Sequence, residues 1–256
     1  MKSWRSLLLL VGLLILVACS TGSSIQTPTG TSTTISQTLT ATPVSVTPRK
    51  VSFLTQDKVR LSGLLYGQSK TVVICSNEYR SSQSDWSTIA PYLAKEGYMV
   101  LTYDYRGYGD SQGTFEGAKL TQDLISALSF ARRLGANTII LMGASMGGTV
   151  TTKVAALEQH RIAAAVVISA PLGFQGDLDV SDADLRAISA ATFFINSNGD
   201  GFVYDIVHMY DEAHSPKQLY LYPGGAHGAS LFYSQYGPDL SQRIVAFFQT
   251  YVITLR

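Results

Sequence analysis

From residue 51 onward the chain alternates short apolar runs with longer amphipathic stretches, and this alternation limits the folds open to it. Strands that are apolar along their whole length are buried on both faces, so they predict a parallel sheet covered on each side by helices. The runs that predict strands are residues 51–54, 59–66, 71–76, 98–105, 138–144, 164–169, 192–196 and 218–222. The stretches that predict helices are residues 85–96, 119–134, 146–159, 202–214 and 240–251.

The order of these segments makes the expected fold more specific. The first two strands flank the turn-like Gln56-Asp57-Lys58 and predict an opening hairpin. No Gly-x-Gly-x-x-Gly follows the strand at 71–76, so the phosphate loop of a dinucleotide site is missing. We therefore expect one α/β domain over residues 51–256, with a mostly parallel eight-stranded sheet and helices on both faces.

Charge and cysteine content exclude two classes of protein. The 256 residues carry 19 Lys and Arg against 18 Asp and Glu, whereas a nucleic-acid binder shows a basic excess. Two cysteines cannot build a disulfide scaffold. We expect no nucleic-acid partner, and the sequence leaves the oligomeric state open, with a monomer consistent with it.

The first eighteen residues have the pattern of a secretory signal. Lys2 and Arg5 precede an apolar run at 7–17, which is shorter than the roughly 20 residues that span a bilayer. The end of the run, Leu16-Val17-Ala18-Cys19, resembles the lipobox of bacterial lipoproteins. The resemblance implies cleavage before Cys19, acyl chains on that cysteine and an extracytoplasmic, lipid-anchored protein. An ordinary signal peptide or a short membrane anchor is the alternative.

Residues 19–50 predict a disordered linker that follows the lipidated cysteine. Sixteen of the 31 residues from 20 to 50 are Ser or Thr, and the only charges are Arg49 and Lys50. Such a segment has almost nothing to bury. We expect it to separate the domain from a membrane surface.

The clearest chemical motif is Gly143-Ala144-Ser145-Met146-Gly147, a Gly-x-Ser-x-Gly pattern. It follows the predicted strand 138–144 and opens a predicted helix, the setting of a nucleophile elbow. The small residues at 143 and 147 suit a strained turn that brings neighbouring backbone close to the serine. A glycine-rich turn with a structural serine is the alternative.

A serine nucleophile needs a base and an acid. His227 lies in the glycine-rich segment Gly224-Gly225-Ala226-His227-Gly228, directly after the last strand, and is favoured as the base. Asp200 follows the strand 192–196 and is favoured as the acid that orients the imidazole. Asp205 is its competitor, but it falls on the following helix. His160, His208 and His214 are assigned to the surface or to packing.

These motifs together resemble the α/β-hydrolase superfamily, in particular its small bacterial serine hydrolases of the esterase, lysophospholipase and aminopeptidase-like branch. The resemblance covers residues 51–256 and includes the loop Asp104-Tyr105-Arg106-Gly107-Tyr108-Gly109-Asp110-Ser111. It implies the α/β-hydrolase fold and a triad of Ser145, His227 and Asp200.

One segment departs from the family pattern. The His-Gly that usually follows the third strand is replaced by Ser76-Asn77-Glu78-Tyr79. A backbone donor does not depend on the side chain, so the N–H of Glu78 or Tyr79 is expected to complete an oxyanion hole with the N–H of Met146. The Glu78 side chain either disfavours anionic substrates or points to solvent.

The short connection between the predicted strands 164–169 and 192–196 leaves no room for a large cap domain. We therefore expect an open site, and loop position predicts which apolar residues line it. The predicted pocket residues are Tyr79, Tyr105, Tyr108, Leu172, Phe174 and Phe202.

Other reactive side chains have simpler interpretations. Cys75 ends a buried strand and is favoured as a core residue over a reactive thiol. The acids at 177, 179, 182 and 184 lack the glycine and glutamate of a calcium loop and indicate a solvated loop before a helix at 183–190. No metal or cofactor is expected.

The function that these observations predict is hydrolysis of a small-molecule carboxylic ester through an acyl-enzyme on Ser145. Two alternatives stay open. One is amide or peptide hydrolysis on the same fold, and the other is a non-catalytic binding lipoprotein that kept the fold.

Overall fold

The computed structural model describes residues 46–252 except residue 215. The predicted signal peptide 1–18, the predicted lipidation site Cys19 and most of the predicted linker lie outside these residues. Arg49 and Lys50, the last two residues of that linker, form the start of the first strand. No helix in the described ranges 46–214 and 216–252 is long and apolar enough to cross a membrane.

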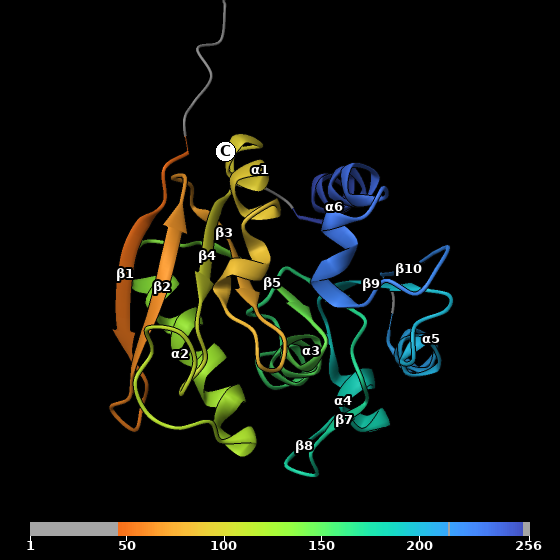
Figure 1. Cartoon of the computed structure of the whole chain (residues 1–256), viewed down its shortest axis with the longest axis horizontal. Helices are drawn as coiled ribbons and strands as arrows, with labels where there is room; N and C mark the ends of the chain where they lie inside the picture. Colours follow the sequence, from red (N-terminus) through yellow and green to blue (C-terminus); the bar gives the residue numbers. More distant parts are fainter. Residues whose placement is uncertain (1–45, 215, 253–256) are drawn as a thin grey trace, which may run out of the picture. The chain divides into compact units, whose positions relative to one another are not determined.

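The domain is built on a sheet of eight strands in the order β1-β2-β4-β3-β5-β6-β9-β10 (Figure 1). β1 pairs antiparallel with β2, and β2 pairs antiparallel with β4, while every pairing from β4 to β10 is parallel. The predicted mostly parallel, eight-stranded sheet is confirmed. The strands are β1 (Arg49–Leu54), β2 (Arg60–Tyr66), β3 (Thr71–Ser76), β4 (Met99–Tyr103), β5 (Thr138–Ala144), β6 (Ala164–Ile168), β9 (Ala191–Ser197) and β10 (Lys217–Tyr222).

Successive side chains of each central strand enter opposite cores, as the period of two of a strand requires. In β3, Val72 and Ile74 belong to one buried cluster, whereas Val73 and Cys75 belong to the other. Cys75 is fully buried, in agreement with its assignment to the core, and burial raises the pKa of its thiol well above the usual value. Both faces of the sheet therefore carry a hydrophobic core.

Helices cover both of these cores. The face that contains Val72 and Ile74 is covered by α2, α3, α4 and α5, and the opposite face by α1 and α6 (Figure 1). The helix bounds are α1 (Ile89–Lys95), α2 (Leu120–Arg133), α3 (Met146–Leu157), α4 (Asp182–Ala187), α5 (Val203–Glu212) and α6 (Gly237–Tyr251).

The helix predicted over 85–96 is interrupted. Its first part is a 3-10 turn, Gln83–Trp86, capped by the side chain of Ser82, and α1 begins only at Ile89. Asp104 explains the early start, because its carboxylate accepts hydrogen bonds from the backbone N–H (2.8 Å) and the side-chain amide (2.9 Å) of Gln83. A contact between distant parts of the chain therefore shapes this segment.

The connection between β6 and β9 contains a small hairpin and one short helix. Strands β7 (Gly173–Phe174) and β8 (Leu178–Asp179) pair antiparallel, and α4 follows with a capping box made by Ser181 and Asp184. Within this described connection, where the sequence predicts no large cap domain, the chain has only these short elements. Asp184 also pairs with Lys153 at 2.7 Å, so this acid stabilises local structure.

A buried ion pair attaches the opening hairpin to the rest of the domain. Arg106 is almost fully buried and donates to Asp123 of α2, with the shortest N–O distance 2.6 Å, and to Asp57 in the β1–β2 turn at 2.9 Å. Removing one partner of such a pair leaves a buried charge uncompensated. Arg106 is therefore best explained as a link between the hairpin, the loop after β4 and α2.

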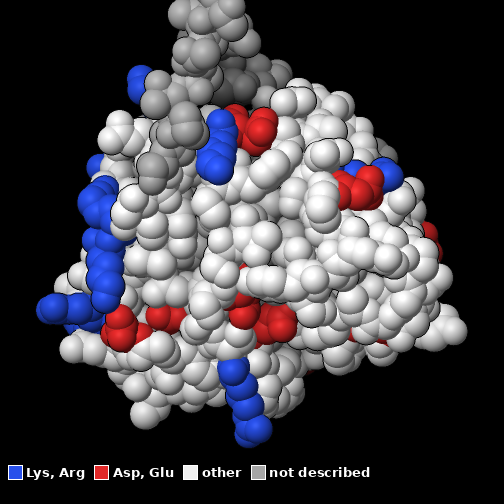
Figure 2. Space-filling model, turned by 45° about the horizontal axis from the view of Figure 1, so that its top comes forward, with Lys and Arg blue, Asp and Glu red and all other residues white. Residues whose placement is uncertain are grey.

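Basic side chains gather at the edge of the sheet formed by the opening hairpin. Arg49, Lys50, Lys58 and Arg60 are exposed there, and Figure 2 shows Lys and Arg along this side of the molecule. β1 is an edge strand with unpaired backbone groups. Charged residues at such an edge hinder pairing with another chain.

Candidate active site

Ser145 occupies a sharp turn between β5 and α3, and its backbone is strained. Its φ of 51° and ψ of −124° are unfavourable for a residue with a side chain. Its N–H donates to the carbonyl of Ile168 in β6 at 2.8 Å, and its own carbonyl accepts from Gly148 at 2.8 Å. The turn therefore has the geometry of the predicted nucleophile elbow, with Ser145 at the carboxyl edge of the central strand.

The two glycines of the elbow are required by close backbone contacts. A Cβ at Gly147 would lie 2.1 Å from the carbonyl oxygen of Ser76, and a Cβ at Gly143 would lie 2.1 Å from that of Gly147. These distances are far below van der Waals contact. Because of this packing, the first turn of α3 lies directly against the segment that follows β3.

His227 and Asp200 form a charge-assisted pair. The Nδ1 of His227 lies 2.7 Å from Oδ2 of Asp200, whose side chain is only 4% exposed. The other carboxylate oxygen, Oδ1, accepts from the N–H of Phe202 at 2.8 Å and from the side-chain amide of Asn196 at 3.2 Å. Asp200 is thus fixed by three partners and orients the imidazole so that its Nε2 is available for proton transfer.

Hydrogen bonds among polar side chains at the ends of β6 and β9 fix the position of this pair. The Oγ of Ser169, at the end of β6, donates to Oδ1 of Asn196 at 2.6 Å, and Asn196 in turn donates to Asp200. Ser197 donates to the carbonyl of Ala226, next to His227, at 2.7 Å. Sequence reasoning missed these residues. The sequence signal that could have identified them is a polar residue at the carboxyl end of an otherwise apolar strand.

The segment 223–229, called the His227 loop from here on, crosses the carboxyl edge of the sheet. It starts after β10, yet the N–H of Ala229 donates to the side chain of Glu78, which follows β3. In the sheet, β5 lies next to β3 on the path between β3 and β10. The loop therefore returns over the strand end that carries Ser145.

Ser145 Oγ has no hydrogen-bond partner among the residues that the structure describes. Catalytic hydrogen bonds are often long without substrate and shorten in the reacting complex. Among residues 46–214 and 216–252, the directly bonded members of the predicted triad are therefore His227 and Asp200, with Ser145 brought to the same edge by the topology.

Two backbone N–H groups are available for an oxyanion hole. Those of Met146 and Tyr79 have no hydrogen-bond partner among the described residues. The N–H of Glu78, the other predicted donor, instead donates to Oδ2 of Asp85 at 3.3 Å. Of the two alternatives, Tyr79 is therefore favoured, because the side chain of Asp85 reaches back from the 3-10 turn and binds the N–H of Glu78.

One predicted pocket residue belongs to the core. Tyr105 is fully buried and packs edge-on against Tyr103, with ring centroids 5.1 Å apart. The prediction that it lines an open site was wrong, because its side chain points into the layer beneath the loop after β4.

Three other predicted pocket residues share an aromatic cluster. Tyr79 contacts Phe174 of β7, with ring centroids 5.0 Å apart, and Phe115, with centroids 5.5 Å apart. Tyr108 stacks on Phe115 at 5.4 Å. Phe115 was not predicted because it lies in an irregular loop without a periodic pattern. The four rings are half-buried and lie beside the segment that carries the Tyr79 N–H.

Leu172 and Phe202, the remaining two predicted pocket residues, have other contacts than this aromatic cluster. Phe202 lies against the His227 ring at 5.6 Å between centroids. The N–H of Leu172 donates to Asp205 at 3.0 Å, so Asp205 secures the segment after β6, and His227 pairs with Asp200 instead. Of the other histidines, His208 lies 2.8 Å from Asp182, and His214 is exposed.

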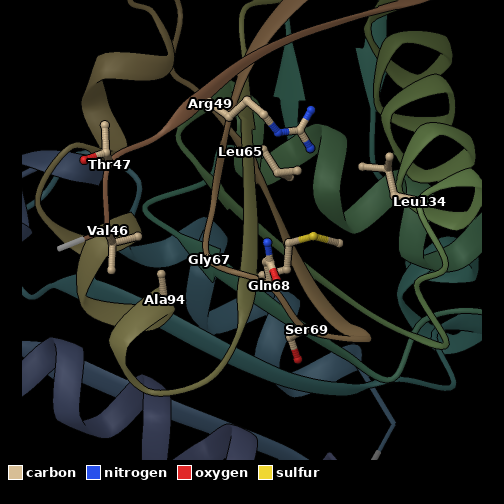
Figure 3. A pocket seen from close by; sticks show the side chains of 10 residues that line it. Val46, Thr47, Arg49, Leu65, Gly67, Gln68, Ser69, Ala94 and Leu134 are labelled. Atoms are coloured by element: carbon tan, nitrogen blue, oxygen red, sulfur yellow. The ribbon is translucent and has the colours of Figure 1, made fainter. Parts of the chain in front are cut away.

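A hollow of about 790 Å³ lies at the opposite edge of the sheet (Figure 3). Its lining includes Gly67, Gln68 and Ser69, just before β3, and Leu134, just after α2. These positions mark the amino ends of the parallel strands, whereas Ser145, Asp200 and His227 follow carboxyl ends. The hollow is therefore separate from the candidate active site.

Comparison with known proteins agrees with this architecture. The model of the family described as serine aminopeptidase, S33 matches residues 67–190, which include the elbow. A Pyrococcus furiosus esterase superposes with a TM-score of 0.72, at 21% identity, over 81% of this chain and 94% of its own. A Penicillium α/β hydrolase superposes with a TM-score of 0.68, at 17% identity, over 82% of this chain and 100% of its own. The chain has the α/β-hydrolase fold.

Curated relatives match part of their length only. Bifunctional epoxide hydrolase 2 of Rattus norvegicus is 27% identical over 135 residues, which are 51% of this chain and 24% of that protein. The chain spans about a quarter to a half of the first curated relatives that it matches.

The elbow packing yields a stability prediction. Gly147→Ala inserts a methyl group against the Ser76 carbonyl and should lower the free energy of unfolding by about 1–3 kcal/mol, the usual range for overpacking. Gly201→Ala is the matched control, because a Cβ there meets nothing within 4 Å, and it should stay within about 0.5 kcal/mol of the wild type. Urea denaturation followed by circular dichroism measures both, and equal stability of the two variants would contradict the packing argument.

Proposed function

We propose that this chain of α/β-hydrolase fold is a serine hydrolase that cleaves carboxylic esters through an acyl-enzyme on Ser145. His227 acts as the general base and Asp200 orients it. The proposal includes an extracytoplasmic location with a lipid anchor at Cys19.

The observation that carries the proposal is the 2.7 Å contact between Nδ1 of His227 and Oδ2 of Asp200, on the same sheet edge as a strained serine. A buried carboxylate that orients one imidazole nitrogen leaves the other free to accept a proton. Strain at a non-glycine residue persists only where its surroundings enforce it, and such sites cluster where chemistry occurs.

In the first half of the reaction, Oγ of Ser145 attacks the ester carbonyl carbon while its proton passes to Nε2 of His227. The carbonyl oxygen becomes an oxyanion, which accepts hydrogen bonds from the N–H groups of Met146 and Tyr79. Each such donor contributes about 2.7–4 kcal/mol to lowering the barrier. Collapse of this intermediate breaks the ester C–O bond, and the imidazolium protonates the leaving alcohol.

In the second half, water replaces the alcohol. The neutral His227 removes a proton from the water, whose oxygen attacks the acyl carbon, and the oxyanion forms in the same place. When the intermediate collapses, the proton returns to Oγ of Ser145 and the carboxylic acid leaves. Asp200 keeps its charge throughout and stabilises the imidazolium that forms in both halves.

The open setting of the site favours a small acyl group or an exposed ester on a larger molecule. The connection between β6 and β9 holds only the two-residue strands β7 and β8 and the short helix α4, which leaves no room for a large cap domain there. Amide or peptide cleavage is a second candidate, favoured by the description of the matching family model as a serine aminopeptidase.

A fluorophosphonate probe tests for an activated nucleophile. The wild type should be labelled covalently, and Ser145→Ala should abolish labelling, because the probe reacts only with an activated hydroxyl. Asp200→Asn should slow labelling by about 10³- to 10⁴-fold, since the imidazole loses its orientation. Asp205→Asn is the matched control and should react like the wild type. A folded wild type that takes up no probe means a non-catalytic binding protein.

The acyl preference follows from the short connection between β6 and β9. With p-nitrophenyl esters of increasing chain length, kcat/KM should be highest for acetate or butyrate and should fall for dodecanoate. A preference for dodecanoate would show that the site offers a long apolar surface, and the proposed small-acyl specificity would be rejected.

Lipidation is tested on the full chain in a bacterial host fed an alkyne-bearing palmitate analogue. The wild type should incorporate the label, and Cys19→Ser should lose it entirely. Cys75→Ser, at the other cysteine of the chain, should keep the label. Label that survives Cys19→Ser rules out the proposed anchor.

A further inference from the structure

The side chain of Glu78 makes a contact that the proposed chemistry does not yet use. Its Oε1 accepts a hydrogen bond from the N–H of Ala229, which is 151 residues away in sequence. Gly228, between Ala229 and His227, has a φ of +54°, and a Cβ at that position would overlap the same carboxylate oxygen. The His227 loop is therefore closely fitted to Glu78, and the fit depends on a glycine.

The His227 loop is fixed at two points on either side of the imidazole. On the β9 side, Ser197 donates to the carbonyl of Ala226, and Asp200 binds the ring of His227. On the β3 side, Glu78 binds Ala229. The loop continues into the 3-10 turn Gly228–Tyr233, whose Leu231 and Phe232 are buried in the core. The contact with Glu78 adds a polar support on this side, two residues from His227.

Glu78 itself is well fixed. Its N–H is bonded to Asp85, its carbonyl accepts from the side-chain amide of Asn77 at 3.2 Å, and its side chain is half-buried. The segment also packs against the elbow, because the carbonyls of Ser76 and Asn77 lie against Gly147. Glu78 therefore connects the position of the elbow to the position of the His227 loop.

We propose that Glu78 is a positioning residue for His227: its carboxylate fixes the His227 loop over Ser145 and supplies negative charge that stabilises the imidazolium formed during proton transfer. This inference rests on the proposed serine hydrolase mechanism. It gives Glu78 a role through its side chain, whereas the sequence indicated a role for its backbone N–H, and it leaves Tyr79 of the same segment as the backbone donor.

The surroundings of Glu78 have opposing effects on the pKa of its carboxyl group. Burial raises the pKa of its carboxyl, and the negative charges of Asp85 and Asp200 act in the same direction, whereas the Ala229 N–H and a positively charged His227 favour the ionised form. A raised pKa means that ionising Glu78 costs folding stability as the pH rises through that pKa. Glu78→Gln, which is neutral and keeps an acceptor oxygen, should therefore be at least as stable as the wild type at neutral pH, even where it is less active.

The test compares Glu78→Gln, Glu78→Ala and the control Glu96→Gln by kcat, KM and the pH dependence of kcat/KM on p-nitrophenyl acetate. Glu78→Ala removes the anchor and the charge, and kcat should fall by about 10- to 100-fold with little change in KM. Glu78→Gln keeps an acceptor oxygen for Ala229, so the loss should be below about tenfold. The acid limb of the profile should nevertheless move to lower pH, because the imidazolium loses the negative charge that stabilises it. Glu96 lies exposed at the end of α1, and its replacement should change nothing.

Amide hydrogen exchange gives a readout that does not need activity. Exchange at Ala229 should be faster in Glu78→Ala and near the wild-type rate in Glu78→Gln. An active wild type whose Glu78 variants keep its kcat, its acid limb and its Ala229 exchange overturns the positioning role. A wild type without fluorophosphonate labelling refutes the proposed function instead, and the exchange rates still decide whether Glu78 fixes the loop.

Discussion

The close approach of backbone between the end of β3 and the first turn of α3 is the constraint on which the site depends. The carbonyl of Ser76 occupies space that any side chain at Gly147 would need. Ser145, at the start of the same helix, has a φ of 51° and a ψ of −124°. The contact also brings the segment containing Tyr79 beside the N–H of Met146. The candidate nucleophile and both candidate oxyanion donors therefore lie on the two segments that this contact packs together.

The second level of organisation is polar and lies along the carboxyl edge. Strands that are apolar in the core end in hydrogen-bonding residues: Ser169 directly after β6, and Asn196 next to the last residue of β9. These residues are buried and are satisfied by one another and by Asp200, so they fix one geometry instead of leaving polar groups unpaired. His227, at 35% exposed, is the member of this network that meets solvent. The arrangement combines a buried, hydrogen-bonded support with a solvent-accessible imidazole.

The sequence predicted the features that depend on local pattern. Strand and helix periodicity gave the eight-stranded sheet, and loop position after each strand singled out Asp200 and His227. The sequence did not predict the features that are set by contacts between residues on separate segments of the chain. Asp85 binds the N–H of Glu78, Asp104 binds Gln83 so that the 3-10 turn begins ahead of the predicted helix, and Tyr105 is buried in the core although it lies in a loop. None of these contacts has a periodic signal, because the partners lie on separate segments that only the folded sheet brings together.

The central claim is that Ser145 carries the acyl group during turnover, and mass spectrometry of the quenched reaction tests it most directly. The full chain is mixed with p-nitrophenyl acetate, stopped in acid within the first turnovers and digested. We predict one added acetyl group on the peptide containing Ser145, present while p-nitrophenol is released and gone once substrate is exhausted. Release of p-nitrophenol without an acetyl group on that peptide, or with the acetyl group on another residue and undiminished turnover by Ser145→Ala, would contradict the account.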